Sequence, residues 1–160
     1  MRAIAVSAHV SRSPDEVFSF LDVLANHVQF TDHMLVDWSF SGPASGVGAL
    51  ARARAATSGN QWMDVSVIES VPATRTVEET VGAKGKRRTR GTYSLVERDG
   101  GTDVSFELEY LEAPLSERIL APAIRRYTRR MNTTAMRRLA ALLEEPRAGA
   151  AAEGGASTLA

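Results

Sequence analysis

Residues 87–111 read RRTRGTYSLVERDGGTDVSFELEYL, and this stretch predicts a β-hairpin. Asp99 and Gly100 lie between two runs of alternating residues. Asp-Gly in such a place is a strong hairpin signal, because a tight two-residue turn needs positive φ at both of its central positions. A two-residue loop places Arg98 opposite Gly101, and this pairing fixes the register of the whole hairpin.

The predicted register gives the hairpin one apolar face and one polar face. The apolar pairs are Leu95 with Val104, Tyr93 with Phe106, and Gly91 with Leu108. The polar pairs are Arg90 with Glu109 and Ser94 with Ser105. An antiparallel sheet of this kind buries its apolar face against another element. We therefore expect the chain to supply a helix that covers it.

That helix is predicted after Pro114, where apolar residues recur every three or four positions. They are Leu120, Ile124, Tyr127, Met131, Ala135, Leu139 and Leu142. Pro122 lies near the start and indicates either a kink or a late beginning. The Ala/Gly-rich residues 146–160 offer few apolar anchors, so we expect a disordered tail after a domain of residues 1–145.

The N-terminal part of the chain predicts a strand and two short helices. Residues 4–10 alternate as a strand does. Ser13 is suited to cap a helix that begins at Pro14, with Glu16 completing a capping box. A second short helical piece extends to Phe30. Further strands are predicted over residues 36–40, 51–55, 63–67 and 75–81.

The strands 51–55 and 63–67 are expected to form a hairpin with a three-residue loop, Ser58-Gly59-Asn60. This loop places Arg54 opposite Asp64 and Arg52 opposite Ser66. The alanines between these residues then face inward.

Composition narrows the classes of function. The 160 residues fit one domain, and 19 basic and 19 acidic side chains cancel, which gives no general attraction to nucleic acid. No cysteine is present, and His9, His27 and His33 are scattered, so no metal site is expected. No run approaches the ~18 apolar residues of a membrane span, and no signal peptide is evident. We expect a cytoplasmic protein without a cofactor.

Basic side chains form two groups, one on the outer side of the long helix and one around the hairpin. The first group is Arg118, Arg125, Arg126, Arg129, Arg130 and Arg137, and the second is Lys84, Lys86, Arg87, Arg88 and Arg90. Because acidic residues balance the second group and the two lie on different surfaces, we expect a solvated, salt-bridged surface. Contact with a membrane surface or an acidic protein is the alternative.

Four short motifs occur in an order that resembles the START/SRPBCC helix-grip superfamily, and within it the polyketide cyclase/dehydrase-like branch. They are residues 10–18, Gly46-Val47-Gly48, Gly100-Gly101-Thr102-Asp103-Val104, and Met136-Arg137-Arg138-Leu139. The resemblance spans about residues 1–145. It implies an α+β fold in which a seven-stranded curved antiparallel sheet wraps around a long C-terminal helix, with two short helices after the first strand. It also implies a cavity for an apolar ligand.

Small inward residues agree with such a cavity. Ala51, Ala53 and Ala55 share the inward face of one strand, and Gly91 leaves a gap on another. The alternative is that the helix approaches closely there and fills the space. The residues expected to contact the ligand are Phe30, Trp38, Val65, Val67, Glu79, Tyr93, Phe106, Tyr127, Met131 and Arg138.

Glu79 and Arg138 are the charged members of this set, because periodicity places both on buried faces. A buried charge is costly unless it is paired, so they could pair with each other or with a ligand. The alternative is that Glu79 lies at the rim of the sheet and that Arg138 extends to water at the end of its helix.

The first hypothesis is a binding protein for a small hydrophobic or amphipathic ligand that is lipid-like or polyketide-like. The alternative is a polyketide aromatase/cyclase that holds a chain in the same cavity. No catalytic residue is assigned, because no nucleophile motif or spaced carboxylate pair is present. His27 and His33 could act as bases near the cavity mouth, although each is expected to be a solvated loop residue. Assembly into a homodimer is left open.

Overall fold

In a computed structural model of the chain, the structure describes residues 2–57 and 61–145. The hairpin predicted first is its longest: β6 (Arg87–Arg98) and β7 (Gly101–Glu112) pair antiparallel with Arg98 opposite Gly101. Asp99 and Gly100 have φ values of 49° and 75°, as the tight turn requires. The predicted apolar and polar pairs are all confirmed.

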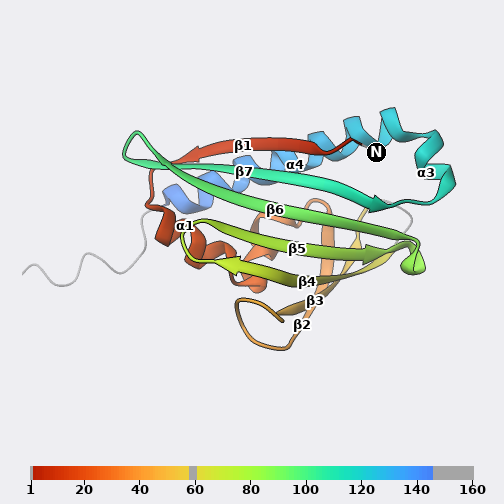
Figure 1. Cartoon of the computed structure of the whole chain (residues 1–160), viewed down its shortest axis with the longest axis horizontal. Coiled ribbons are helices and arrows are strands. Elements are labelled where there is room, and N and C mark those ends of the chain that lie inside the picture. The colour runs from red at the N-terminus through yellow and green to blue at the C-terminus, as the bar shows by residue number, and fades with distance from the viewer. Residues whose placement is uncertain (1, 58–60, 146–160) are drawn as a thin grey trace, which may run out of the picture.

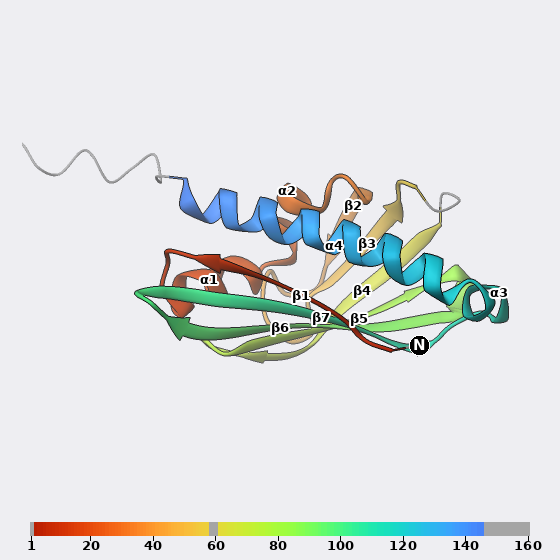
Figure 2. The same ribbon diagram turned by 90° about the horizontal axis from the view of Figure 1, so that it is seen from above.

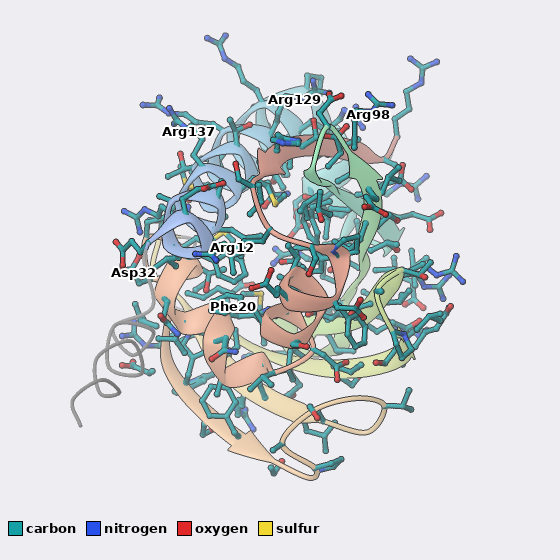
Figure 3. All side chains as sticks on the ribbon, turned by 90° about the vertical axis from the view of Figure 1, so that its left-hand side faces the viewer. Arg12, Phe20, Asp32, Arg98, Arg129 and Arg137 are labelled. Carbon is teal, nitrogen blue, oxygen red and sulfur yellow. The ribbon has the colours of Figure 1, made fainter. Side chains whose placement is uncertain are left out.

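A seven-stranded antiparallel sheet is built around this hairpin, in the spatial order β1-β7-β6-β5-β4-β3-β2 (Figure 1). The remaining strands are β1 (Ile4–Val10), β2 (Leu35–Ser41), β3 (Leu50–Ala55), β4 (Trp62–Val71) and β5 (Arg75–Gly82). A short 3₁₀ turn, η2 (Ala83–Gly85), precedes β6. The sheet curves, and the helices lie on its concave side (Figures 2 and 3). The predicted α+β helix-grip fold is therefore confirmed.

The two short helical segments follow β1 as predicted. α1 (Pro14–Leu21) begins with Ser13 as N-cap, and Glu16 completes the capping box. The second segment consists of the 3₁₀ turn η1 (Leu24–His27) and α2 (Val28–Thr31). Both segments place apolar side chains under the long helix.

The long helix is α4 (Ala121–Glu144), with Pro122 in its first turn. It is preceded by the short helix α3 (Leu115–Ile119), so Pro122 marks a late beginning, because proline fits a first turn where its missing N–H would have no partner. α4 crosses the concave side of the sheet above β1 and β7 (Figure 2). The predicted tail, residues 146–160, lies outside the described residues.

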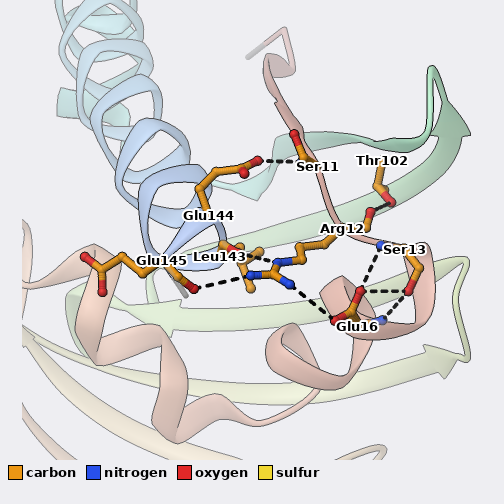
Figure 4. Close-up of polar contacts among 8 residues, drawn as sticks. All are labelled: Ser11, Arg12, Ser13, Glu16, Thr102, Leu143, Glu144 and Glu145. Carbon is orange, nitrogen blue, oxygen red and sulfur yellow. Dashed lines mark hydrogen bonds and ion pairs between the residues drawn. The ribbon is translucent and has the colours of Figure 1, made fainter. Parts of the chain in front are cut away.

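Arg12 ties the end of α4 to the start of α1 (Figure 4). Its Nε donates to the carbonyl oxygen of Leu143 at 2.8 Å, and its Nη2 donates to that of Glu145 at 3.3 Å. Its Nη1 lies 3.8 Å from Glu16 Oε1. A cation at a helix C-terminus satisfies carbonyls that have no partner within the helix and interacts favourably with the helix dipole.

The register predicted between β3 and β4 is wrong by two residues. Arg52, and not Arg54, lies opposite Asp64, and the Ala55 N–H donates to the Gln61 carbonyl. The predicted loop residues 58–60 lie outside the described residues. A shift of two leaves every side chain on its predicted face, so Ala51, Ala53 and Ala55 do face inward.

At one edge of the sheet, β2 is interrupted by a bulge. Its register with β3 shifts between Val36 and Ser39, and Asp37 has a φ of 54°. The Asp37 carboxylate accepts a hydrogen bond from Arg54 Nε at 2.6 Å, which holds the irregular residue against the neighbouring strand.

The two predicted basic groups differ in their partners. On the outer face of the sheet, Glu79 pairs with both Arg88 and Arg90, which confirms the salt-bridged surface there. On α4, Arg129 and Arg137 extend away from the molecule (Figure 3), and Arg129 forms no ion pair among the described residues. This part of the helix surface is therefore solvated, as predicted, but within the described residues its arginines Arg129 and Arg137 form no salt bridge.

Candidate functional site

The interface between α4 and the sheet has two different halves. In the half that we call the closed half, the C-terminal part of α4 packs tightly. Its buried side chains are Ala135, Met136, Leu139 and Leu143, and they contact Val10, Val17, Leu21, Phe30, Tyr93 and Val104. Phe30, Val104 and Leu139 are fully buried. No comparable apolar cluster lies under the N-terminal part of α4 in the described residues.

We call this second region the open half, and it contains a pocket of about 520 Å³. α4 and α3 form one wall, the inner face of β3 to β7 forms the floor, and the segment before β2 closes one side. The apolar lining residues are Met34, Leu35, Ala55, Met63, Leu108, Ile124 and Met131. Three long methionine side chains give this lining an adaptable surface.

A largely buried ion pair closes the α3 end of the pocket. Arg87 Nε, at the start of β6, donates to Glu117 Oε2 on α3 at 2.8 Å, and Arg87 Nη2 also contacts the second carboxylate oxygen. The side chains are 19% and 15% exposed. The hydrogen bonds that Arg87 donates to Glu117 raise the pKa of Arg87 against the opposing effect of burial. These are the charged side chains that line the pocket, and each neutralises the other.

Hydroxyl groups make two further links across the pocket. Tyr127 Oη on α4 is hydrogen-bonded to Thr57 Oγ1 beyond the end of β3. Tyr110 Oη on β7 lies 3.1 Å from Thr128 Oγ1 on α4. The first link joins α4 to the residues that follow β3, and the second joins it to β7.

Two polar atoms in the pocket wall have no hydrogen-bond partner among residues 2–57 and 61–145. They are Asn132 Nδ2 and Gln61 Oε1. Asn132 is 5% exposed, and it is the polar member of the buried residues of α4, the others being Ala135, Met136, Leu139 and Leu143.

A buried ionisable cluster lies between the two halves. His27 Nε2 is 2.8 Å from the Leu21 carbonyl oxygen, and Nδ1 is 3.4 Å from Glu78 Oε1. The ring of His27 meets that of Tyr93 edge-on, with 5.7 Å between centroids. Burial raises the pKa of Glu78, the nearby His27 lowers it by less, and burial also raises the pKa of Tyr93.

The histidines differ from their predicted exposure. His27 is buried rather than a solvated loop residue, because its ring packs between Phe30 and Tyr93. His33 is partly buried, with Nε2 3.0 Å from the Met131 carbonyl oxygen. Neither histidine lines the pocket.

Of the ten residues expected to contact a ligand, Tyr127 and Met131 line the pocket. Phe30, Tyr93 and Phe106 lie in the closed half. Val65, Val67 and Trp38 form a second apolar cluster with Leu24, Ala49 and Ala51. The gap expected at Gly91 is filled, since a Cβ there would be 2.9 Å from Cε2 of Phe106.

The inward orientation predicted for Glu79 and Arg138 is wrong. β5 pairs with β6 so that Thr76 lies opposite Tyr93 and Glu78 opposite Gly91, which puts Glu78 inside and Glu79 outside. The Glu79 carboxylate accepts hydrogen bonds from Arg88 and Arg90, and that from Arg90 is the main reason for its lowered pKa. Arg138 pairs with Asp32 at the surface, at the edge of the buried stripe of α4.

Most of the pocket residues that sequence reasoning missed are polar, namely Thr57, Gln61, Thr80, Arg87, Thr89, Tyr110, Glu117, Thr128 and Asn132. A signal existed for Asn132, because it lies three positions before Ala135 and seven before Leu139 on the predicted apolar stripe. The inward orientation of Thr80 and Glu78 follows from the pairing of β5 with β6.

Metal binding and membrane insertion are two further possibilities for the chain. In the described part of the chain, no three His, Cys, Asp or Glu side chains gather as metal ligands would. Within the same residues, no helix is both long and apolar enough to cross a bilayer.

Comparison with known proteins identifies the family. A model of the family described as polyketide cyclase/dehydrase and lipid transport matches residues 1–144. A search of curated proteins found no match. Among solved structures, CV1439 from Chromobacterium violaceum is 21% identical, with a TM-score of 0.68 over 91% of this chain and 100% of that one.

Two other solved structures share the fold at lower identity. DynU16, from the dynemicin biosynthetic locus, is 16% identical with a TM-score of 0.62, over 89% of this chain and 47% of that one. Ara h 8.0201 is 11% identical with a TM-score of 0.58, over 86% of this chain and 97% of that one.

Proposed function

This chain belongs to the polyketide cyclase/dehydrase and lipid transport family, and on that premise we propose that it binds a small hydrophobic or amphipathic molecule in the open half. The observation that carries the proposal is the unfilled space of about 520 Å³ between α4 and the sheet. Protein interiors are normally close-packed, and ligand pockets typically measure about 300–1,000 Å³.

The lining supports an apolar ligand body. Leu108, Ile124 and Met131 face the space together with two other methionines and a leucine. Transfer of apolar ligand surface from water to this lining is favourable by about 25 cal/mol per Å². The few polar groups then fix the orientation of the ligand.

The alternative, cyclisation of a polyketide-like chain, needs a group in the pocket that can move a proton. Among the described residues, the ionisable side chains of the lining are Arg87, Tyr110, Glu117 and Tyr127. Glu117 is bound by Arg87, and both tyrosine hydroxyls are bonded to threonines. These contacts favour binding over proton transfer.

The test is binding of a neutral fluorescent apolar probe, N-phenyl-1-naphthylamine, to the full chain and to two variants. Ile124→Trp puts a bulky ring into the pocket, and Ala141→Trp adds the same ring on an exposed position of the same helix. We expect the first variant to lose probe binding and the second to retain it. Equal binding by both folded variants would overturn the proposal. Native mass spectrometry of protein from its own host then identifies any retained ligand.

A further inference from the structure

The polar atoms of the pocket wall specify the ligand more closely. Asn132 Nδ2 is a hydrogen-bond donor without a partner among the described residues, on a side chain that is 5% exposed and lines the pocket. Buried polar groups nearly always have partners, because an unmet donor forfeits the hydrogen bonds it makes in water. An asparagine on an otherwise apolar helix face therefore needs an explanation.

The neighbours of Asn132 on α4 show that an apolar residue would suit the helix at this position. The buried residues that follow it are Ala135, Met136, Leu139 and Leu143, which all pack against the closed half. Asn132 lies one turn nearer the N-terminus, at the point where the packing ends and the pocket begins. Asn132 thus lies at the inner end of the pocket. Its Nδ2 is enclosed by the surrounding side chains, and the described residues supply no acceptor for it.

The charges of the pocket argue for a neutral ligand. Arg87 and Glu117 are its charged lining residues, and they form a two-contact ion pair with each other. A ligand carboxylate or ammonium would therefore meet no unmatched opposite charge, and would lose its hydration without compensation. The second unpartnered atom, Gln61 Oε1, is an acceptor and suits a hydroxyl group.

We propose that Asn132 anchors a neutral ligand with an apolar skeleton: its amide turns toward the pocket, and Nδ2 donates a hydrogen bond to a carbonyl or hydroxyl oxygen of the ligand. This inference rests on the proposed function, and it adds the ligand class and the residue that recognises it. The pocket should therefore bind neutral oxygenated molecules more tightly than anionic lipids such as fatty acids.

The test uses three naphthalene probes of similar shape: 2-acetylnaphthalene, 2-ethylnaphthalene and 2-naphthoate. Binding is measured by fluorescence for the wild-type chain, Asn132→Leu, and Thr76→Val. Thr76 is a matched control, because it is buried and polar but does not line the pocket. Near-UV circular dichroism confirms that each variant is folded.

We expect the wild-type chain to bind the ketone roughly tenfold more tightly than the hydrocarbon, since one satisfied buried donor is worth about that factor. Asn132→Leu should remove this preference by weakening ketone binding alone, while Thr76→Val keeps it. 2-Naphthoate should bind most weakly.

Equal affinity for ketone and hydrocarbon in the wild-type chain would overturn the anchor while leaving the pocket as a binding site. So would equal weakening of both by Asn132→Leu, or tightest binding of 2-naphthoate. If none of the three probes binds and Ile124→Trp has no effect on the binding of N-phenyl-1-naphthylamine, the proposed function itself fails. The two failures are thereby distinguishable.

Discussion

The closed and open halves are covered by one continuous helix, yet they differ in what lies beneath it. Under the closed half, Leu139 and Met136 fill the space to the sheet, and Arg12 fixes the helix end. Over the open half, α4 is held by hydroxyl links and by the Arg87–Glu117 pair at the neighbouring α3. The difference indicates that the closed half supplies stability, which allows the open half to leave the space that we propose as a ligand site.

The sharpest test of this comparison is the loss of one aliphatic side chain from each half. Leu139→Ala should lower the free energy of unfolding by about 2–5 kcal/mol, because it leaves a cavity in a packed core. Ile124→Ala should cost about 1 kcal/mol or less, since its side chain already faces open space. Urea denaturation measures both. Equal losses would contradict the division into two halves.

Arg12→Ala tests whether the closed half depends on its fixed helix end. Loss of the hydrogen bonds to the Leu143 and Glu145 carbonyls should destabilise the fold by about 1–2 kcal/mol. Arg137→Ala, on the exposed side of α4, is the control and should change stability by about 0.5 kcal/mol at most. Thermal unfolding measures both, and similar effects would show that Arg12 has no special role.

Glu78 lies at the boundary between the halves, and its raised pKa predicts a pH dependence. The folded chain retains a proton on Glu78 that the unfolded chain releases above the ordinary pKa of 4.5. Stability is therefore lost as the pH rises from that value through the higher folded pKa. Glu78→Gln should remove this loss of stability. The difference in free energy of unfolding between the variant and the wild-type chain should therefore grow, in favour of the variant, as the pH rises.

Glu79, the next residue, provides a control of opposite sign. Its folded pKa is lowered, first by the hydrogen bond from Arg90, so its contribution is present above the ordinary pKa and is lost as the pH falls through the folded value. Glu79→Gln should be less stable than the wild-type chain at neutral pH and should match it in acid. Denaturation curves between pH 3 and 8 compare both variants, and parallel pH profiles would refute the assigned orientations.

The smallest effect is expected at the pocket mouth. Tyr127→Phe removes the hydrogen bond to Thr57 from a side chain that is 42% exposed. Water replaces this hydrogen bond readily, so the free energy of unfolding should change by about 0.5 kcal/mol or less. A loss as large as that for Leu139→Ala would mean that the open half is as cooperative as the closed one.

Local chemistry explains which parts of the fold were predictable from the sequence. The Asp99-Gly100 turn and the Ser13 capping box each depend on neighbouring residues, and both are confirmed. The β3–β4 register was missed because alternation is unchanged by a shift of two. The fold class was therefore predictable from the sequence, whereas the register between β3 and β4 was not.

The site was less predictable, because it depends on pairing and packing between distant segments. On β5 the valines Val77 and Val81 suggested the inward face, but pairing with β6 turns Thr76, Glu78 and Thr80 inward. Helical periodicity predicted an inward position for Tyr127 and Met131, and both line the pocket. Nothing local, however, indicates where α4 stops filling the concave face.

The bulge at Asp37 has a consequence for how these molecules meet in concentrated solution. An open sheet has two outer strands whose unpaired backbone groups can recruit a strand from another chain. Because β2 is kinked between Val36 and Ser39, a straight incoming strand could match only a few of its N–H and C=O groups at a time. The bulge thus hinders edge-to-edge polymerisation through β2.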